Sequence, residues 1–411
     1  MTLHRLTDEG DPTATAAALR ALAPAGTSVS GTVSEIVAAV RTRGAPALRE
    51  YAARFDGVEG PLRVEPEEVA AALASLEGEV RAGLEVAIRN VRQVAEAGLA
   101  PDAVVALPEG QRVTLREVPV RRAAIYVPGG RNPYPSTVVM GVVTARAAGV
   151  DEVVVCAPGG HPVILAACAL CGADEVWRIG GAHAVAALAY GIDDVARVDV
   201  IAGPGSLYVQ EAKRQVSGDV GIDGFAGPSD VLVLAAGDAD PELVAADLLA
   251  QAEHGAGTVV ALITDDDALA ADVAGRLGDD VGDAAAAIVR VADLQTGIRV
   301  ADAFAPEHLQ LVGAGAEALV GAIRSAGAVF VGAASGTAFG DYVAGSNHTL
   351  PTGGAARFAS GLSPRHFRRR MSIVEIGPAA AALAPPGIAV AHAEGFNRHA
   401  ASMRVRENRD R

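Results

Sequence analysis

Lysine is almost absent from this chain of 411 residues, and cysteine is scarce. Lys213 is the single lysine while arginine is plentiful, a bias that we attribute to coding composition. The three cysteines are Cys156, inside an apolar run, and Cys168 and Cys171, which form a lone C-x-x-C in an Ala- and Leu-rich segment. One such pair without a second pair or a nearby histidine is weak evidence for zinc. We therefore interpret all three as reduced thiols of a protein in a reducing compartment.

Long apolar runs and excess positive charge are missing as well. Apolar residues make up 50% of the chain, yet no run approaches the roughly 18 uncharged residues of a membrane span. The first six residues lack the apolar core of a signal peptide. The net charge of −15 argues against a nucleic-acid partner, and we interpret the one basic cluster, residues 365–370, as a solvated helix face. These absences predict a soluble cytoplasmic protein that binds neither membrane nor nucleic acid.

Short apolar runs alternate with helical patterns along most of the chain. Residues 14–56 and 66–98 are expected to be helical. Two series of apolar runs follow, and each run ends at Gly or Pro before a helical pattern, which is typical of parallel βαβ units. The runs are 123–127, 152–156, 175–179 and 198–201 in the first series, and 231–234, 259–263, 288–291 and 328–331 in the second. After Pro351 the pattern is helical, with a break at residues 385–387. We predict an α/β fold of two Rossmann-like parallel-sheet domains with small helical N- and C-terminal segments, and a seam near residues 226–228.

A short helix is predicted between Asp240 and Gly255. Asp240 can cap its first N–H groups, Pro241 suits the first helical position, and Gly255 ends it. Gln251 and His254 are three residues apart in the last turn, so both side chains project from one face. An imidazole and an amide oxygen there suit a divalent metal. A polar last turn with a histidine favoured by the helix dipole explains the same residues.

Acid–base side chains gather in three further segments after position 250. Glu307 and His308 are neighbours, a Gly-rich run over residues 339–352 carries Asp, Asn and His, and residues 392–399 hold two histidines and a glutamate. Such clustering favours a functional site over scattered surface residues.

Glycine turns follow the predicted strands in the middle of the chain. They lie at residues 126–130, 180–181 and 203–205, at the edge where open α/β sheets bind ligands. Glycine lets a ligand approach the backbone closely, although ordinary strand-to-helix turns explain these residues as well. The run Gly313-Ala-Gly315 mimics a dinucleotide motif, and we interpret it as a simple turn before an Ala-rich helix.

A series of motifs, kept in order over roughly residues 110–405, makes the chain resemble the histidinol dehydrogenase family. The motifs are Tyr126-Val-Pro-Gly-Gly130 with Pro135-Ser136-Thr137, Gly180-Gly181-Ala182, Gly203-Pro204-Gly205 with Tyr208-Val209, Ile222-Asp223, Ala226-Gly227-Pro228-Ser229, Gln251-Ala-Glu-His254, Pro306-Glu307-His308-Leu309, Gly340-Asp341-Tyr342, Gly345-Ser346-Asn347-His348, and Ala393-Glu394 with His399.

The domain boundaries that we expect follow the family pattern. They are an N-terminal arm of residues 1–20, an α/β domain of 21–107 and 229–360 that carries the zinc and catalytic residues, an NAD-binding α/β domain of 108–228, and a C-terminal helical arm of 361–411 that contacts a partner subunit.

The resemblance implies an enzyme that oxidises L-histidinol through L-histidinal to L-histidine, with NAD⁺ as the cofactor and one Zn²⁺ per subunit. It implies a homodimer with shared active sites, in which His308 is the general base and Glu307 activates water. The implied zinc ligands are Gln251, His254 and Asp341 from one subunit and His399 from the other. The implied substrate contacts are these four ligands with His308, Ser136, Ser229, His348 and Glu394, and the implied cofactor contacts are Tyr126, His183 and Ser206.

The chain departs from the family pattern at three positions. His183 stands where a glutamine usually follows Gly-Gly-Ala, Ser206 stands where an asparagine usually follows Gly-Pro-Gly, and Asp230 stands where a glutamate usually follows Gly-Pro-Ser. Histidine and serine still form hydrogen bonds, so we expect NAD⁺ binding with altered affinity. The changes leave open a related dehydrogenase of another small alcohol. A metal-dependent hydrolase is a rival of a different class, since zinc with Glu and His also suits water activation.

Overall fold

The computed structural model describes residues 3–23, 28–130, 132–192, 195–225, 227–278 and 280–407. The chain divides into two compact units, one of Met1–Gly98 with Val120–Phe367 and one of Leu99–Pro119 with Arg368–Arg411. Residues 24–27, inside the helix predicted over 14–56, and Ala226, at the predicted seam, lie outside the described residues. Among the residues described, no helix has the length and apolar character needed to cross a bilayer.

A five-stranded parallel sheet forms the middle of the first unit, with the order β6-β5-β4-β7-β8. Its strands are β4 (Arg122–Tyr126), β5 (Glu152–Cys156), β6 (Glu175–Trp177), β7 (Val200–Ala202) and β8 (Gly221–Ile222). The order counts 3-2-1-4-5 along the chain, as in doubly wound folds, and the direction of winding reverses between β4 and β7.

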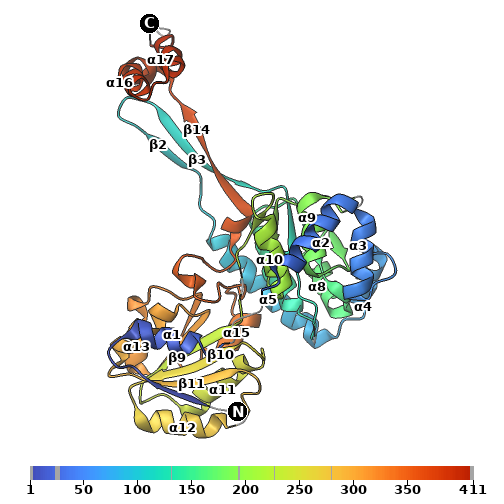
Figure 1. Ribbon diagram of the computed structural model, residues 1–411, viewed down its shortest axis with the longest axis vertical. Coiled ribbons are helices and arrows are strands. Elements are labelled where there is room, and N and C mark those ends of the chain that lie inside the picture. The colour runs from blue at the N-terminus through green and yellow to red at the C-terminus, as the bar shows by residue number, and fades with distance from the viewer. Residues whose placement is uncertain are drawn as a thin grey trace. The chain divides into compact units, whose positions relative to one another are not determined.

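Helices that precede β4 in the sequence and helices that connect the strands together cover this sheet (Figure 1). They are α2 (Ser30–Arg43), α3 (Ala45–Tyr51), α4 (Pro66–Ala74), α5 (Gly78–Ala97), α6 (Pro135–Val138), α7 (Thr144–Ala147), α8 (Pro162–Cys171), α9 (Gly181–Tyr190) and α10 (Leu207–Val216). Val33 of α2 packs in one core with Ala124 of β4, and Leu84 of α5 packs in another with Ile125. The expected grouping of residues 21–107 with 229–360 is therefore wrong, because the apolar faces of these helices are buried against the five-stranded sheet.

A second, six-stranded parallel sheet has the order β1-β11-β10-β9-β12-β13. Its strands are β1 (His4–Thr7), β9 (Asp230–Ala235), β10 (Val259–Thr264), β11 (Ala285–Arg290), β12 (His308–Val312) and β13 (Ala328–Val331). Its last five strands repeat the 3-2-1-4-5 order. The helices of this part are α1 (Pro12–Arg20), α11 (Pro241–Ala252), α12 (Asp267–Leu277), α13 (Leu294–Phe304), α14 (Ala314–Glu317) and α15 (Thr337–Tyr342). The segment expected as an N-terminal arm belongs here, because β1 pairs with β11 and Leu19 of α1 is fully buried.

The second unit combines three antiparallel strands with two helices. The elements are β2 (Ala103–Ala106), β3 (Arg112–Pro119), β14 (Arg368–Glu375), α16 (Ala380–Ala393) and α17 (Asn397–Arg404). The basic cluster is helical only in its first half, within a 3-10 helix (Pro364–Phe367). Its second half lies in β14, where Arg370 pairs with Glu117 of β3 at 2.6 Å. The break expected at Pro385 and Pro386 is also wrong. Helix α16 runs through both, because the fixed φ of proline fits a helix even though its missing N–H does not.

The predicted α/β class with two Rossmann-like parallel sheets is confirmed, and each apolar run that predicted a strand overlaps one. The antiparallel sheet of the second unit was not predicted. Charged and polar residues interrupt β3 and β14, so neither has the apolar run of a buried strand, and the four apolar residues of β2 were passed over.

Candidate active site

One cavity of about 380 Å³ is bordered by edges of both parallel sheets. From the five-stranded sheet come the turns at Gly129 and Gly205, which follow β4 and β7 at the carboxyl edge, where the strand order reverses. From the six-stranded sheet come Ser229, Glu307 and His308, which lie at the amino ends of β9 and β12. The cavity thus places flexible glycine backbone opposite acid–base side chains.

Asp230 and Glu307 hold the starts of β9 and β12 together through reciprocal hydrogen bonds. The N–H of Glu307 donates to Oδ1 of Asp230 at 2.6 Å, and the N–H of Asp230 donates to Oε2 of Glu307 at 3.2 Å. The hydroxyl of Ser229 also donates to Oε2 of Glu307. Burial raises the pKa of Glu307 to about 8. Burial and the neighbouring Glu307 raise the pKa of Asp230 to about 7. Glu307 is therefore poised to exchange a proton near neutral pH.

His308 is buried beside this pair. Its Nδ1 lies 3.2 Å from the carbonyl oxygen of Asp230, so Nδ1–H donates there and Nε2 is left as the basic nitrogen. Burial lowers the pKa of His308, which favours the neutral imidazole. A neutral ring with Nε2 free of a proton is the form that a general base needs.

Gln251 lies in the last turn of helix α11, as the sequence predicts, whereas His254 lies in the turn that follows the end of the helix at Ala252. Asp240 caps that helix by accepting from the N–H of Glu242 at 2.8 Å. Nδ1 of His254 lies 3.1 Å from the carbonyl oxygen of Gln251, and the amide Nε2 of Gln251 donates to the hydroxyl of Ser229. These bonds leave Nε2 of His254 and Oε1 of Gln251 as the donor atoms for a cation.

Asp341, His348 and Ser136 complete the part of the predicted site that lies around the cavity. Asp341 ends α15, and burial raises its pKa, while His308 and His254 oppose that rise. Nδ1 of His348 lies 3.1 Å from the carbonyl oxygen of Asp341, and burial lowers the pKa of His348 to about 4. Within the described ranges, no three His, Cys, Asp or Glu side chains form a metal-binding group. The donor set of this unit is one imidazole, one carboxylate and one amide.

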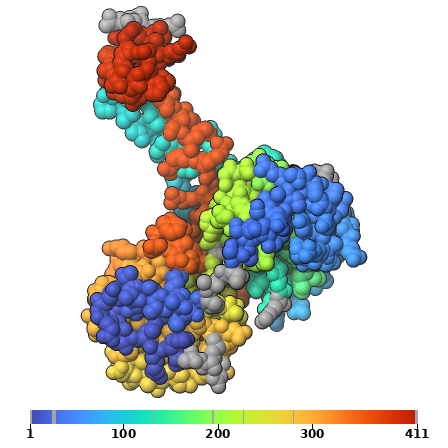
Figure 2. Space-filling view, viewed as in Figure 1, coloured from blue at the N-terminus to red at the C-terminus, as the bar shows by residue number. Residues whose placement is uncertain are grey.

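Glu394 and His399 lie in the second unit. With Phe396 and Met403 they border a depression where α16 packs against α17, two helices that are coloured red in Figure 2. The rings of His399 and Phe396 meet edge to face at 5.1 Å. The structure therefore brings Ser136, Ser229, Gln251, His254, Glu307, His308, Asp341 and His348 together in one unit and places Glu394 and His399 in the other.

A larger cavity of about 810 Å³ lies along the glycine turns and is bordered by Tyr126, His183 and Ser206. The hydroxyl of Tyr126 accepts from the N–H of Gly181 at 2.9 Å. Nε2 of His183 lies 2.8 Å from Oδ2 of Asp56, and the His183 side chain is only 1% exposed. The size of this cavity and its place at the reversal of strand order suit a dinucleotide.

The turn at Gly313 agrees with its interpretation as a simple turn. The N–H of Ala314 donates to Asp238 at 3.1 Å, and the N–H of Gly313 donates to Glu317 at 3.2 Å. Carboxylates thus occupy the N–H groups that a phosphate would need.

Three residues that support the site were not assigned to it from the sequence. Asp230 was noted only as a departure from the family, and Asp56 only as the last residue of a predicted helical segment. Arg20 lies at the end of α1, where its guanidinium is 3.7 Å from Oδ2 of Asp230 and 3.8 Å from the ring centre of Phe304. No local pattern marks these residues, because each acts on a partner distant in the sequence.

Comparisons with known proteins all give the same family, and each covers most of the chain. A sequence model of the histidinol dehydrogenase family matches residues 23–407. Histidinol dehydrogenase of Mycolicibacterium smegmatis is 45% identical over 395 residues, 89% of each chain. That of Rhizobium meliloti (strain 1021) is 43% identical over 404 residues, 92% of each chain. The crystal structure of histidinol dehydrogenase from Elizabethkingia anophelis matches 98% of each chain with a TM-score of 0.92 and 30% identity.

The raised pKa of Glu307 predicts a pH-dependent effect of Glu307→Gln on stability. The folded carboxyl has a pKa of about 8, against about 4.3 in an unfolded chain. Between these pH values the folded state therefore binds more protons than the unfolded state. The contribution of the neutral carboxyl to folding stability is fully present below the unfolded pKa and is lost as the pH rises through about 8. Glutamine has no such loss, so the variant should gain stability over wild type between about pH 5 and about pH 8.

Urea denaturation of chelator-treated protein at about pH 5 and at about pH 8 measures this gain in the free energy of unfolding. Glu35→Gln, on an exposed position of α2, is the matched control. An equal stability difference at the two pH values for Glu307→Gln would contradict a buried neutral carboxyl.

Proposed function

The chain belongs to the histidinol dehydrogenase family, and we propose that it is a zinc-dependent enzyme that oxidises L-histidinol through L-histidinal to L-histidine with two NAD⁺. It is accordingly an oxidoreductase of histidine biosynthesis. Membership in a dehydrogenase family argues against the metal-dependent hydrolase.

One observation carries the proposal. Gly129 borders both the cavity with Glu307 and His308 and the larger cavity along the glycine turns. A substrate in the first and a dinucleotide in the second would therefore meet across backbone without a side chain between them. NAD⁺, when bound, accepts the hydride, and the residues of the chain handle the protons.

His308 is proposed to remove the hydroxyl proton of the alcohol. Its Nε2 is the basic nitrogen, because Nδ1–H is bonded to the carbonyl oxygen of Asp230. Glu307 is proposed to take a proton from water as water adds to the aldehyde, since its pKa of about 8 lets it gain and lose a proton near neutrality. Ser229 holds the Glu307 carboxyl, and Ser136 and His348 border the same cavity, where they would contact substrate.

Gln251, His254 and Asp341 are proposed to hold Zn²⁺. Oε1 of Gln251, Nε2 of His254 and the half-buried carboxylate are donors that zinc accepts, and burial of the Asp341 carboxylate favours a positive ion there. Zinc, when bound, supplies coordination positions that fix the amino and imidazole groups of the substrate. Three donors leave the set one ligand short of the usual four.

His399 of a second subunit is proposed to provide the fourth ligand, and Glu394 of that subunit to accept from the substrate imidazole. The second unit supports this because it exposes many large apolar side chains, as a surface that docks on another chain does. Those exposed by more than half are Val104, Val374, Val390, Phe396 and Val405.

Tyr126, His183 and Ser206 are proposed to border bound NAD⁺. His183 is already bonded to Asp56, so we propose that it shapes the cavity wall and offers its other ring nitrogen to the cofactor. The departures at His183 and Ser206 lie on the cofactor side, whereas the departure at Asp230 lies beside Glu307. Whether histidinol or another small alcohol is the substrate is decided by the assay described next.

The direct test is NADH formation by the purified protein. With L-histidinol, NAD⁺ and Zn²⁺ we expect two NADH per histidinol, followed by NADH absorbance. Chelation should abolish turnover and zinc should restore it, because the proposed ligands position the substrate. Full activity after complete removal of metal would refute the zinc proposal, and turnover of other alcohols alone would favour the alternative substrate.

The second prediction separates the two neighbours Glu307 and His308. His308→Asn should slow oxidation of the alcohol by about 10²–10⁴, the usual contribution of a positioned acid–base group. Glu307→Gln should spare that step and slow oxidation of histidinal, since only the aldehyde step needs activated water. Single-turnover measurements with each substrate check this, and equal slowing of both steps by Glu307→Gln would rule out the division.

The third prediction tests the shared site by mixing subunits. His308→Asn and His399→Asn homodimers should each be nearly inactive, because every site carries one lesion. In a heterodimer one site has both lesions and the other has none, so random reassortment of equal amounts should restore about a quarter of wild-type activity. Mixing His308→Asn with Glu307→Gln is the control and should restore nothing, since both residues come from the same unit. No recovery in the first mixture despite proven exchange would contradict the shared site.

A further inference from the structure

Lys213 is the single lysine of the chain, and it is buried in α10 with a side chain only 1% exposed. Its ammonium donates to the carbonyl oxygen of Gly203 at 3.1 Å and to Oδ1 of Asp223. Oδ2 of Asp223 in turn accepts from the N–H of Gly203 at 2.7 Å. One buried ion pair thus binds both backbone polar groups of a single glycine.

Gly203 begins the turn that separates three cavities. Pro204 and Gly205 border the cavity with Glu307, while Ser206 borders the larger cavity proposed for NAD⁺. Lys213 and Asp223 border a third, mostly apolar cavity of about 270 Å³. The Lys213–Asp223 pair, which we call the clamp, therefore acts on backbone that forms part of the walls of both proposed ligand sites.

The turn is closely packed, so it cannot change conformation after loss of the Lys213–Asp223 pair unless its neighbours also move. Gly203 has a φ of +125°, and a Cβ there would lie 2.2 Å from the carbonyl oxygen of Tyr126. A Cβ at Gly205 would lie 2.6 Å from the Val209 side chain. Close packing on both sides means that a small displacement of Gly203 is passed to Tyr126 and to Ser206.

Stability alone is a poor reason for this ion pair. Apolar residues of similar size often replace a buried ion pair with equal or greater stability, because desolvation offsets the attraction of the charges. The chain also uses arginine at every other strongly basic position. Lysine at this one place indicates a need for a compact ammonium that donates in several directions, which the planar guanidinium cannot replace.

We propose that Lys213 and Asp223 are positioning residues that hold the Gly203–Ser206 turn in the conformation that binds the dinucleotide. This inference rests on the proposed use of NAD⁺. Neither residue is expected to touch the substrate.

The test compares NADH binding by wild type with binding by the double variant Lys213→Met, Asp223→Asn. The variant removes both charges together, and the amide oxygen of asparagine can still accept from Gly203. We expect the Kd of NADH, measured by fluorescence titration, to rise roughly tenfold to a hundredfold, as when a supporting partner of a ligand site is removed. The KM for histidinol should change much less. A folded variant with the wild-type Kd overturns the inference, whereas a wild type that fails to bind NADH overturns the proposed cofactor.

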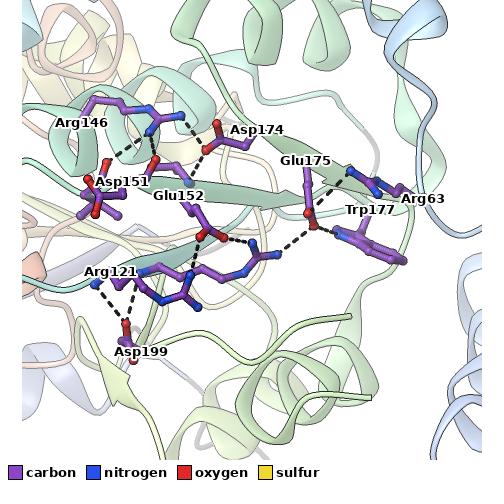
Figure 3. Close-up of polar contacts among 12 residues, drawn as sticks. Arg63, Arg121, Arg146, Asp151, Glu152, Asp174, Glu175, Trp177 and Asp199 are labelled. Atoms are coloured by element: carbon purple, nitrogen blue, oxygen red, sulfur yellow. Dashed lines mark hydrogen bonds and ion pairs between the residues drawn. The ribbon is translucent and has the colours of Figure 1, made fainter. Parts of the chain in front are cut away.

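A matched control lies at the amino ends of the strands of the same sheet. The Arg122 side chain, 4% exposed, pairs there with Glu175 at 2.8 Å and with Glu152. Glu175 and Glu152 lie in that charged cluster in Figure 3. Arg122→Met, Glu175→Gln should lower the melting temperature and leave the Kd of NADH unchanged. A similar loss of NADH affinity in this control would show that general destabilisation, and not the turn, explains the effect.

The single lysine allows a second test on the unaltered protein. Reductive methylation modifies one ε-amine per chain, and peptide mass spectrometry separates it from the N-terminal amine. Methylation of Lys213 should be slow, and saturating NADH should slow it further because the bound dinucleotide holds the turn closed over the clamp. An unchanged rate with NADH overturns the inference, even if the double variant fails to fold.

Discussion

The reciprocal hydrogen bonds between Asp230 and Glu307 are the constraint on which the site depends. They join the amino ends of β9 and β12, which are distant in the sequence but adjacent in the sheet. The carbonyl oxygen of Asp230 then fixes the tautomer of His308, and the Glu307 carboxyl engages Ser229, which is bonded to Gln251. A single backbone register thereby orients the base, the second carboxyl and part of the donor set. A slip of this register would misplace all of them together.

The two parallel sheets share a strand order and use it differently. The five-stranded sheet presents glycine turns at its carboxyl edge, the usual ligand edge of such folds. At the corresponding edge of the six-stranded sheet, Asp238 and Glu317 occupy the N–H groups around Gly313. Its amino edge carries Glu307 and His308 instead. Strand order alone therefore does not tell which edge of a doubly wound sheet is functional; the side chains at each edge decide it.

Two buried pairs of polar side chains support the glycine turns of the larger cavity. Lys213 with Asp223 and His183 with Asp56 both lie beside glycine turns of the larger cavity, and each aspartate also accepts from a glycine N–H. Each carboxylate thus accepts from a backbone N–H of a turn, as a phosphate does at many helix N-termini. This arrangement explains how His183 can replace the amide usual in the family while the backbone of the turn is kept.

The sequence by itself determined eight of the eleven strands described in the two parallel sheets, the helix that carries Gln251 in its last turn, and the family, because these rest on apolar periodicity, caps and short motifs. The short strands β1 and β8 were not predicted, and β12 was missed because His308 and Gln310 interrupt its apolar run. Only the tertiary structure decided that residues 28–98 cover the five-stranded sheet, that residues 368–375 form a strand, and that Asp230, Asp56 and Lys213 support the sites. Periodicity tells that a helix has an apolar face but not which sheet buries it, and a lone aspartate or lysine shows its role only through partners far along the chain.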